Sequence, residues 1–308
     1  MTTSLNNQNY NIKTGKFTST GTSCAFTLRT PQTTSPTQFP AILMLHGWGG
    51  TQNSWVWPFA ERFLSMGFAV MTFDYRGWGQ SEGTPRHVTK VKDRIKDAEA
   101  ALNFLKNQLE VDATRIVLWG TSLGGGHACS VAAKHPELFG IIAQVPMLDG
   151  SAAAKITPLR QKIRLGAHAL ADLIPMRKPI YIPIYASPDN FGTLTRDGAA
   201  ALKQESERLY GKSTENFIAA RSILTMGSYK PLDVLPKINT PTLIIWGRND
   251  TVAPFPFKAV QSISKPNFKI VELNANHFEP YLTPVFLENI EHQMRFLDTL
   301  LEKTKKKA

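Results

Sequence analysis

The chain has 308 residues, 42% of them hydrophobic, enough for a full core, which excludes general disorder. No apolar run approaches the roughly 18 residues of a membrane-spanning helix, which argues against a transmembrane protein and against stable membrane insertion. The net charge of +11 raises the question of nucleic acid, but no zinc finger or RNA-binding aromatic signature accompanies it, so no nucleic-acid partner is expected.

The N-terminus and the cysteines bear on cellular location. The start, MTTSLNNQNYNIKTGKF, is polar and lacks the apolar segment of a secretory signal. The two cysteines, Cys24 and Cys129, show neither metal-binding nor redox spacing. We therefore expect a cytoplasmic protein with reduced thiols and without a metal or organic cofactor. A solvated, frayed tail is expected at the C-terminal lysines, which are Lys303, Lys305, Lys306 and Lys307.

Short apolar runs that alternate with helical patterns predict a mostly parallel sheet of eight strands with helices on both faces. Gly15–Thr20 and Cys24–Arg29 come first, and they alternate as antiparallel strands around a turn at Gly21. The fully apolar runs predicted as strands are Ala41–Leu45, Phe68–Phe73, Arg115–Trp119, Ile141–Val145, Thr242–Trp246 and Phe268–Leu273.

Apolar residues at helical spacing predict the elements between these strands. The helices expected are Ser54–Met66, Val88–Leu109, Ser122–Lys134, Phe257–Ser264 and Val285–Leu301.

Residues 150–237 break this alternation. They contain two helical pieces, Leu159–Ile174 and Ala199–Tyr210, around a proline-rich stretch. Because this segment is too long for a loop in a compact domain, it predicts a cap inserted into a core made of residues 1–149 and 238–308. Two options are open for its apolar residues, which can pack in the cap or form a substrate pocket wall: Ile180, Tyr181, Ile182, Ile184, Tyr185 and Phe191.

The sequence GTSLG, residues 120–124, points most directly to chemistry. It lies between a predicted strand and a helix of small residues, the context of the G-x-S-x-G nucleophile elbow. The sharp turn needs glycines around the serine, and it presents the serine oxygen at the edge of the sheet. Ser122 is therefore the predicted nucleophile.

A serine nucleophile needs a base, and His277 is the predicted one. It follows the strand Phe268–Leu273, so it lies at the same sheet edge as Ser122. His127 is expected to be packed or half-exposed in the elbow helix, and His168 can face either way in the cap. The remaining candidates are expected at the surface, namely His87, His135 and His292.

The base in turn needs a carboxylate to orient its ring. Asp250 in GRNDTVAP follows the strand Thr242–Trp246 and gives the chain order Ser, Asp, His that this elbow predicts. Asp149 is the alternative, because it also follows a strand, although it can simply cap a loop. We favour Asp250.

A tetrahedral intermediate also needs backbone donors for its oxyanion. The glycine-rich HGWGG, residues 46–50, follows the strand Ala41–Leu45. We assign the N–H groups of Trp48 and Leu123 as the oxyanion hole, and we expect His46 to brace the loop. The alternative is that these glycines serve only to reverse the chain.

Together these motifs resemble the α/β-hydrolase fold over nearly the whole chain. FDYRGWGQS, residues 73–81, resembles the D-x-R-G-x-G-x-S turn of that family, which implies a structural role for Asp74 and Arg76. The segment 124–150 is also similar to predicted hydrolases that include acyl-transferring members of fungal polyketide pathways. The serine at the elbow differs from the aspartate of haloalkane dehalogenases and epoxide hydrolases, but is compatible with hydroxynitrile lyases and cofactor-free haloperoxidases.

The resemblance and the candidate residues predict a serine hydrolase that cleaves carboxylic esters through an acyl-enzyme. Thioester hydrolysis, acyl transfer or peptide cleavage on the same three residues is the alternative, and a non-enzymatic binding protein is a third option. The expected partner is a small-molecule ester or acyl substrate. The oligomeric state is open, with a homodimer as one option.

Overall fold

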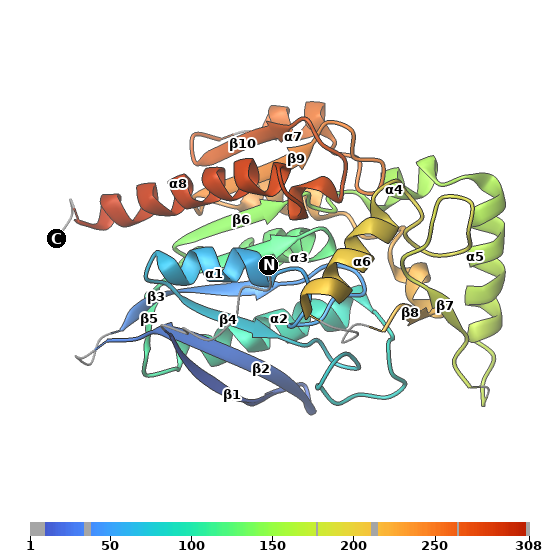
Figure 1. Cartoon of the computed structure of the whole chain (residues 1–308), viewed down its shortest axis with the longest axis horizontal. Helices are drawn as coiled ribbons and strands as arrows, with labels where there is room; N and C mark the ends of the chain where they lie inside the picture. Colours follow the sequence, from blue (N-terminus) through green and yellow to red (C-terminus); the bar gives the residue numbers. More distant parts are fainter. Residues whose placement is uncertain (1–9, 34–37, 177, 211–214, 264, 306–308) are drawn as a thin grey trace.

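The structure is a computed structural model that describes residues 10–33, 38–176, 178–210, 215–263 and 265–305 (Figure 1). The polar N-terminal residues 1–9 and the tail lysines at 306 and 307 lie outside the described residues.

One sheet of eight strands organises the molecule, in the order β1-β2-β4-β3-β5-β6-β9-β10. The first two pairings, β1 with β2 and β2 with β4, are antiparallel, and the others are parallel. Every predicted strand is present, which confirms the fold class. The strands are β1 (Tyr10–Ser19), β2 (Thr22–Pro31), β3 (Phe39–Leu45), β4 (Ala69–Phe73), β5 (Val111–Thr121), β6 (Gly140–Gln144), β9 (Thr242–Gly247) and β10 (Phe268–Leu273).

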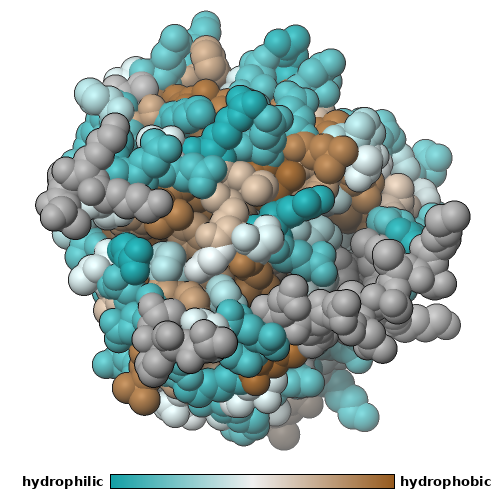
Figure 2. Space-filling view, turned by 60° about the vertical axis from the view of Figure 1, so that its left-hand side comes forward, coloured by the Kyte–Doolittle hydropathy of each residue, from teal (hydrophilic) through white to brown (hydrophobic). Residues whose placement is uncertain are grey.

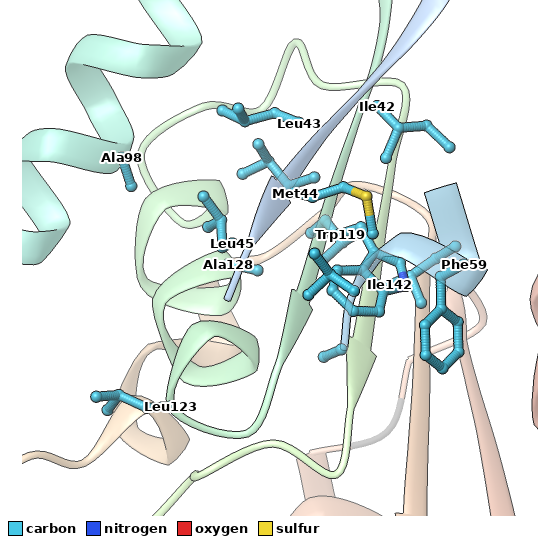
Figure 3. Close-up of a cluster of buried hydrophobic side chains, with 14 of the residues drawn as sticks. Ile42, Leu43, Met44, Leu45, Phe59, Ala98, Trp119, Leu123, Ala128 and Ile142 are labelled. Atoms are coloured by element: carbon cyan, nitrogen blue, oxygen red, sulfur yellow. The ribbon is translucent and has the colours of Figure 1, made fainter. Parts of the chain in front are cut away.

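Helices cover both faces of this sheet. Along β3, Leu43 and Leu45 point toward one layer of helices, and Ile42 and Met44 point toward the other (Figure 3). All four are at most 1% exposed, because a strand covered on both sides buries consecutive residues. The helices of the core are α1 (Trp57–Ser65), α2 (Val91–Lys106), α3 (Leu123–Ala132), α7 (Phe257–Ile263) and α8 (Val285–Lys305).

Residues 150–237 lie together at one end of the sheet, between β6 and β9 in the chain (Figure 1). Both predicted helical pieces are present, whereas α4 and the short β7–β8 pair were not expected. A division into core and cap domains stays a prediction. The elements are α4 (Gly150–Ile156), α5 (Leu159–Asp172), β7 (Tyr181–Pro183), α6 (Ala199–Tyr210), β8 (Phe217–Ala219), η1 (Ala220–Thr225) and η2 (Pro231–Lys237).

The prediction that His87 lies at the surface is wrong. His87 is 6% exposed, and its Nε2 atom lies 2.8 Å from a carboxylate oxygen of Glu215. The β7–β8 pair covers it, since the N–H of Ala219 donates to its carbonyl at 2.9 Å and the ring of Phe217 packs 4.7 Å away. Trp78 also packs against the imidazole, with the ring centres 4.9 Å apart. Phe217 and Ala219 lie far from His87 in the chain, so local sequence gives no sign of their contacts with it.

The surface is mixed in character. On the face shown in Figure 2, hydrophilic residues project outward and hydrophobic residues are visible between them. Among the helices in the described ranges, none has the length and hydropathy that a membrane span requires.

Candidate active site

Ser122 occupies the sharp turn between β5 and α3. Its backbone has φ 54° and ψ −121°, a conformation that residues with a side chain rarely adopt. The flanking glycines are required by space, because a Cβ on Gly120 would lie 2.2 Å from the Gly124 oxygen. A Cβ on Gly124 would lie 2.0 Å from the oxygen of Leu45 in β3. The close packing of β5, α3 and β3 therefore fixes the position of the serine.

His277 is placed directly against this serine. It lies between β10 and the short helix η3 (Glu279–Tyr281), and its Nε2 atom is 2.9 Å from the Oγ atom of Ser122. The His277 side chain is 4% exposed. Its loop is held by Asn276, whose side-chain oxygen accepts the N–H of Phe278 at 2.8 Å. The structure therefore brings together the predicted nucleophile and base.

Asp250 lies on the other side of the imidazole. Its Oδ2 atom is 2.6 Å from His277 Nδ1, and its Oδ1 atom accepts the N–H groups of Val252 and Ala253, each at 2.8 Å. The turn that carries this carboxylate therefore also fixes its orientation.

Asp149, the alternative carboxylate, has a different position. It is the N-cap of α4, and it accepts the N–H groups of Ser151 and Ala152 at 2.9 and 3.1 Å. Burial opposes ionisation of Asp149, but these hydrogen bonds outweigh it and lower the pKa of the carboxyl. Its contacts are those of a helix cap.

The glycine-rich loop at 46–50 lies beside the serine. A Cβ on Gly47 would be only 3.1 Å from the Cβ of Ser122, and Trp48 and Leu123 line the same pocket as the serine. Within the part of the chain that the structure describes, the N–H groups of Trp48 and Leu123 donate to no protein acceptor. Both groups are therefore available to a ligand.

Arg94 holds this loop from behind, and sequence reasoning missed it. Its Nη2 atom donates to the carbonyl oxygens of His46 and Gly47 at 2.9 and 3.1 Å, and its guanidinium lies 3.8 Å from the ring centre of Tyr75. The signal was present, because Arg94 follows Val91 by three positions and precedes Ala98 by four. That spacing places it on the buried face of α2.

His46 braces the same loop. Its Nδ1 atom lies 3.2 Å from the carbonyl oxygen of Gly47. Burial and the charge of Arg94 hold the pKa of His46 well below its usual value of 6.5. These contacts agree with the bracing role that we expected.

A pocket with a cavity volume of about 370 Å³ opens above Ser122. Apolar residues from the inserted segment and from the core line much of it, among them Ala153, Leu165, Leu194, Ile223, Met226 and Val252. Two options were open for the apolar residues at 180–191, namely packing or a pocket wall. Ile182 and Ile184 are buried, which agrees with packing. None of the six residues in question is among those that line this pocket.

Asp74 and Arg76 make the contacts of structural residues. Asp74 accepts the N–H groups of Gln52 and Gln80 at 2.8 and 3.0 Å, and the Nε atom of Arg76 donates to Asp97 at 2.9 Å. These hydrogen bonds connect the turn after β4 to the loop after β3 and to helix α2.

The two cysteines and the possible metal ligands lie apart from this chemistry in the sequence predictions, and the structure shows their surroundings. Cys24 and Cys129 are both buried and free, and burial raises the pKa of each thiol to about 12. Over the described ranges, no group of three or more His, Cys, Asp or Glu side chains is placed to hold a metal ion.

Comparison with known proteins identifies the family. The sequence profile described as serine aminopeptidase, S33, matches residues 37–259. The quorum-quenching protein AidA of Acinetobacter baumannii is 33% identical over 93% of this chain and 94% of its own length. The thiohydrolase aneE of Aspergillus aculeatus is 26% identical over 85% of this chain and 86% of its own.

A solved structure shows the same fold. The α/β hydrolase GrgF from Penicillium matches with a TM-score of 0.75 and 22% identity, over 94% of this chain and 98% of its own. The profile match and the similarity to AidA together show that the chain belongs to the serine aminopeptidase S33 family of α/β hydrolases.

Proposed function

We propose that the protein is a serine hydrolase that cleaves carboxylic esters through an acyl-enzyme on Ser122. The observation that carries the proposal is the pair of consecutive hydrogen bonds, 2.9 Å from Ser122 to His277 and 2.6 Å from His277 to Asp250, at the base of a largely apolar pocket. A nucleophile, a base and an orienting carboxylate in this order are the parts that acyl transfer requires.

In the proposed reaction, Ser122 Oγ attacks the ester carbonyl carbon while His277 Nε2 takes the hydroxyl proton. Asp250 accepts the Nδ1 hydrogen of His277, which holds the ring in the reactive tautomer and stabilises the imidazolium that forms. His277 then returns the proton to the alcohol as the C–O bond of the ester breaks. A water molecule attacks the acyl-enzyme by the same path and frees Ser122.

The oxyanion of each tetrahedral intermediate would bind the N–H groups of Trp48 and Leu123. The N–H of Leu123 lies in the first turn of α3, where the helix dipole favours negative charge. The N–H of Trp48 belongs to the same peptide group as the carbonyl of Gly47, to which Arg94 donates at 3.1 Å. Arg94 therefore orients and polarises this donor before substrate binds.

Thioester hydrolysis is the second candidate. It uses the same nucleophile and base, and the relative aneE carries the name thiohydrolase. Acyl transfer and peptide cleavage are further reactions of the same three residues. They differ from ester hydrolysis in the leaving group or the acceptor, which the residues of the inserted segment around the pocket would select.

Initial rates on p-nitrophenyl esters from acetate to palmitate test the proposal. We expect Ser122→Ala to lose more than about 10³-fold in kcat. The matched control is Ser262→Ala, at an exposed serine of α7, and it should keep the parental rate. Ester hydrolysis that survives in Ser122→Ala would refute the role of Ser122, and turnover of thioesters alone would favour the second candidate.

A further inference from the structure

Helix α5 and the turn after it expose nearly half of the exposed large apolar side chains in the described chain. We name this patch the α5 surface. Its residues, each between 51% and 106% exposed, are Leu159, Ile163, Leu170, Leu173, Ile174 and Met176.

Three of these side chains form a stripe on the helix itself. Leu159, Ile163 and Leu170 repeat at helical spacing, so they share one side of α5, and the other three follow in the turn after it. The opposite side packs inward, where Ala169 is fully buried and Asp172 forms an ion pair with Arg221 at 2.8 Å. The apolar face of this amphipathic helix is therefore turned outward, at the edge of the molecule (Figure 1). A contiguous exposed apolar patch of this kind indicates an interaction site.

The exposed charged residues of the segment that carries the patch are positive. Asp172 is the sole acidic residue between positions 150 and 178, and it is buried and paired. Within the described ranges, none of the exposed basic side chains of this segment forms an ion pair with a carboxylate; they are Lys155, Arg160, Lys162, Arg164 and Lys178.

An outward apolar stripe bordered by lysine and arginine matches the chemistry of an anionic lipid surface. Apolar side chains enter the boundary between headgroups and acyl chains, while the cations pair with lipid phosphates. A second copy of this chain fits less well, because two equally basic faces would repel each other. We propose that the α5 surface docks the protein on an anionic lipid bilayer, with α5 lying in the plane of the interface.

Docking of this kind would place the pocket beside the lipid. Gln161, Lys162 and Leu165 of α5 line the pocket above Ser122, and so does Leu224, which is itself 45% exposed. A substrate dissolved in the membrane would then reach the pocket along the same helix. This consequence rests on the proposed function, whereas docking itself does not.

Co-sedimentation of the full chain with vesicles tests docking directly. We expect binding to vesicles of phosphatidylcholine mixed with phosphatidylglycerol, and weaker binding to phosphatidylcholine alone or at raised salt. The double variant Leu159→Gln/Ile163→Gln should lower the affinity at least about tenfold, because it removes two inserted side chains. Neither residue lines the pocket, so turnover of a soluble p-nitrophenyl ester should be unchanged.

The matched control is Leu109→Gln, at a leucine that is 87% exposed but lies between α2 and β5. It should bind vesicles like the parent. Absence of vesicle binding by the parent, or equal binding by the double variant, would overturn the proposal. A parental dimer that the double variant converts to monomer, without vesicle binding, would instead assign the α5 surface to self-association. Vesicle binding without esterase activity would support docking and count against the proposed function alone.

Discussion

Ser122, Asp250 and His277 come from three loops, and the first and last are separated by 155 positions in the chain. Each loop follows a parallel strand, β5, β9 or β10, so their positions after strands were enough to predict that they meet at one sheet edge. The sequence favours Asp250 but leaves Asp149 as an alternative, because both follow strands. The hydrogen bonds of the two carboxylates distinguish them.

A pair of matched substitutions tests this assignment. Asp250→Asn should lower kcat on esters by about 10⁴-fold, because an amide at this position favours the wrong tautomer of His277. Asp149→Asn should leave kcat nearly unchanged, since asparagine also caps a helix N-terminus well. Steady-state kinetics on both variants, with circular dichroism as a check of folding, would show which carboxylate orients His277. A larger loss of kcat in Asp149→Asn than in Asp250→Asn would reverse the assignment.

At the scale of elements, the sequence predicts every strand of the large sheet and the helices that pack on it, but misses short elements of the inserted segment. Strand β3 and helix α8 carry enough apolar residues to show their period. The strands β7 (Tyr181–Pro183) and β8 (Phe217–Ala219) have three residues each, too few for any period, and they form by pairing across a large separation in the chain. Helix α4 was also not predicted, although Asp149 at its N-cap and the alanines at positions 152–154 are local signs of a helix.

The junction of β5, α3 and β3 is the element-scale feature on which the site depends most. Gly124→Ala should destabilise the protein by about 2–3 kcal/mol, because its Cβ would lie 2.0 Å from the backbone oxygen of Leu45. Gly166→Ala is the matched control within α5, where a Cβ meets nothing within 4 Å, and it should stabilise by about 0.5–1 kcal/mol. Urea unfolding of both variants measures these changes, and equal stabilities would contradict the packing described.

For the whole molecule, the order of elements predicts an α/β hydrolase. It does not predict which side of a helix in the inserted segment faces the solvent. Helical spacing shows which residues of α5 share a side, and an apolar side is normally expected to face the core. Here the apolar stripe faces outward, because the opposite side of α5 packs against η1 through Asp172 and Arg221. That outcome depends on contacts between distant segments of the chain.

Covalent labelling with a fluorophosphonate, read by intact mass and peptide mapping, tests the nucleophile most directly, because the reagent needs no knowledge of the natural substrate. The hydrogen-bonded geometry of Ser122, His277 and Asp250 predicts one adduct, located on Ser122, that forms far more slowly in His277→Ala. A folded parent protein that stays unlabelled, or an adduct on another residue, would contradict the assignment of Ser122 as an activated nucleophile.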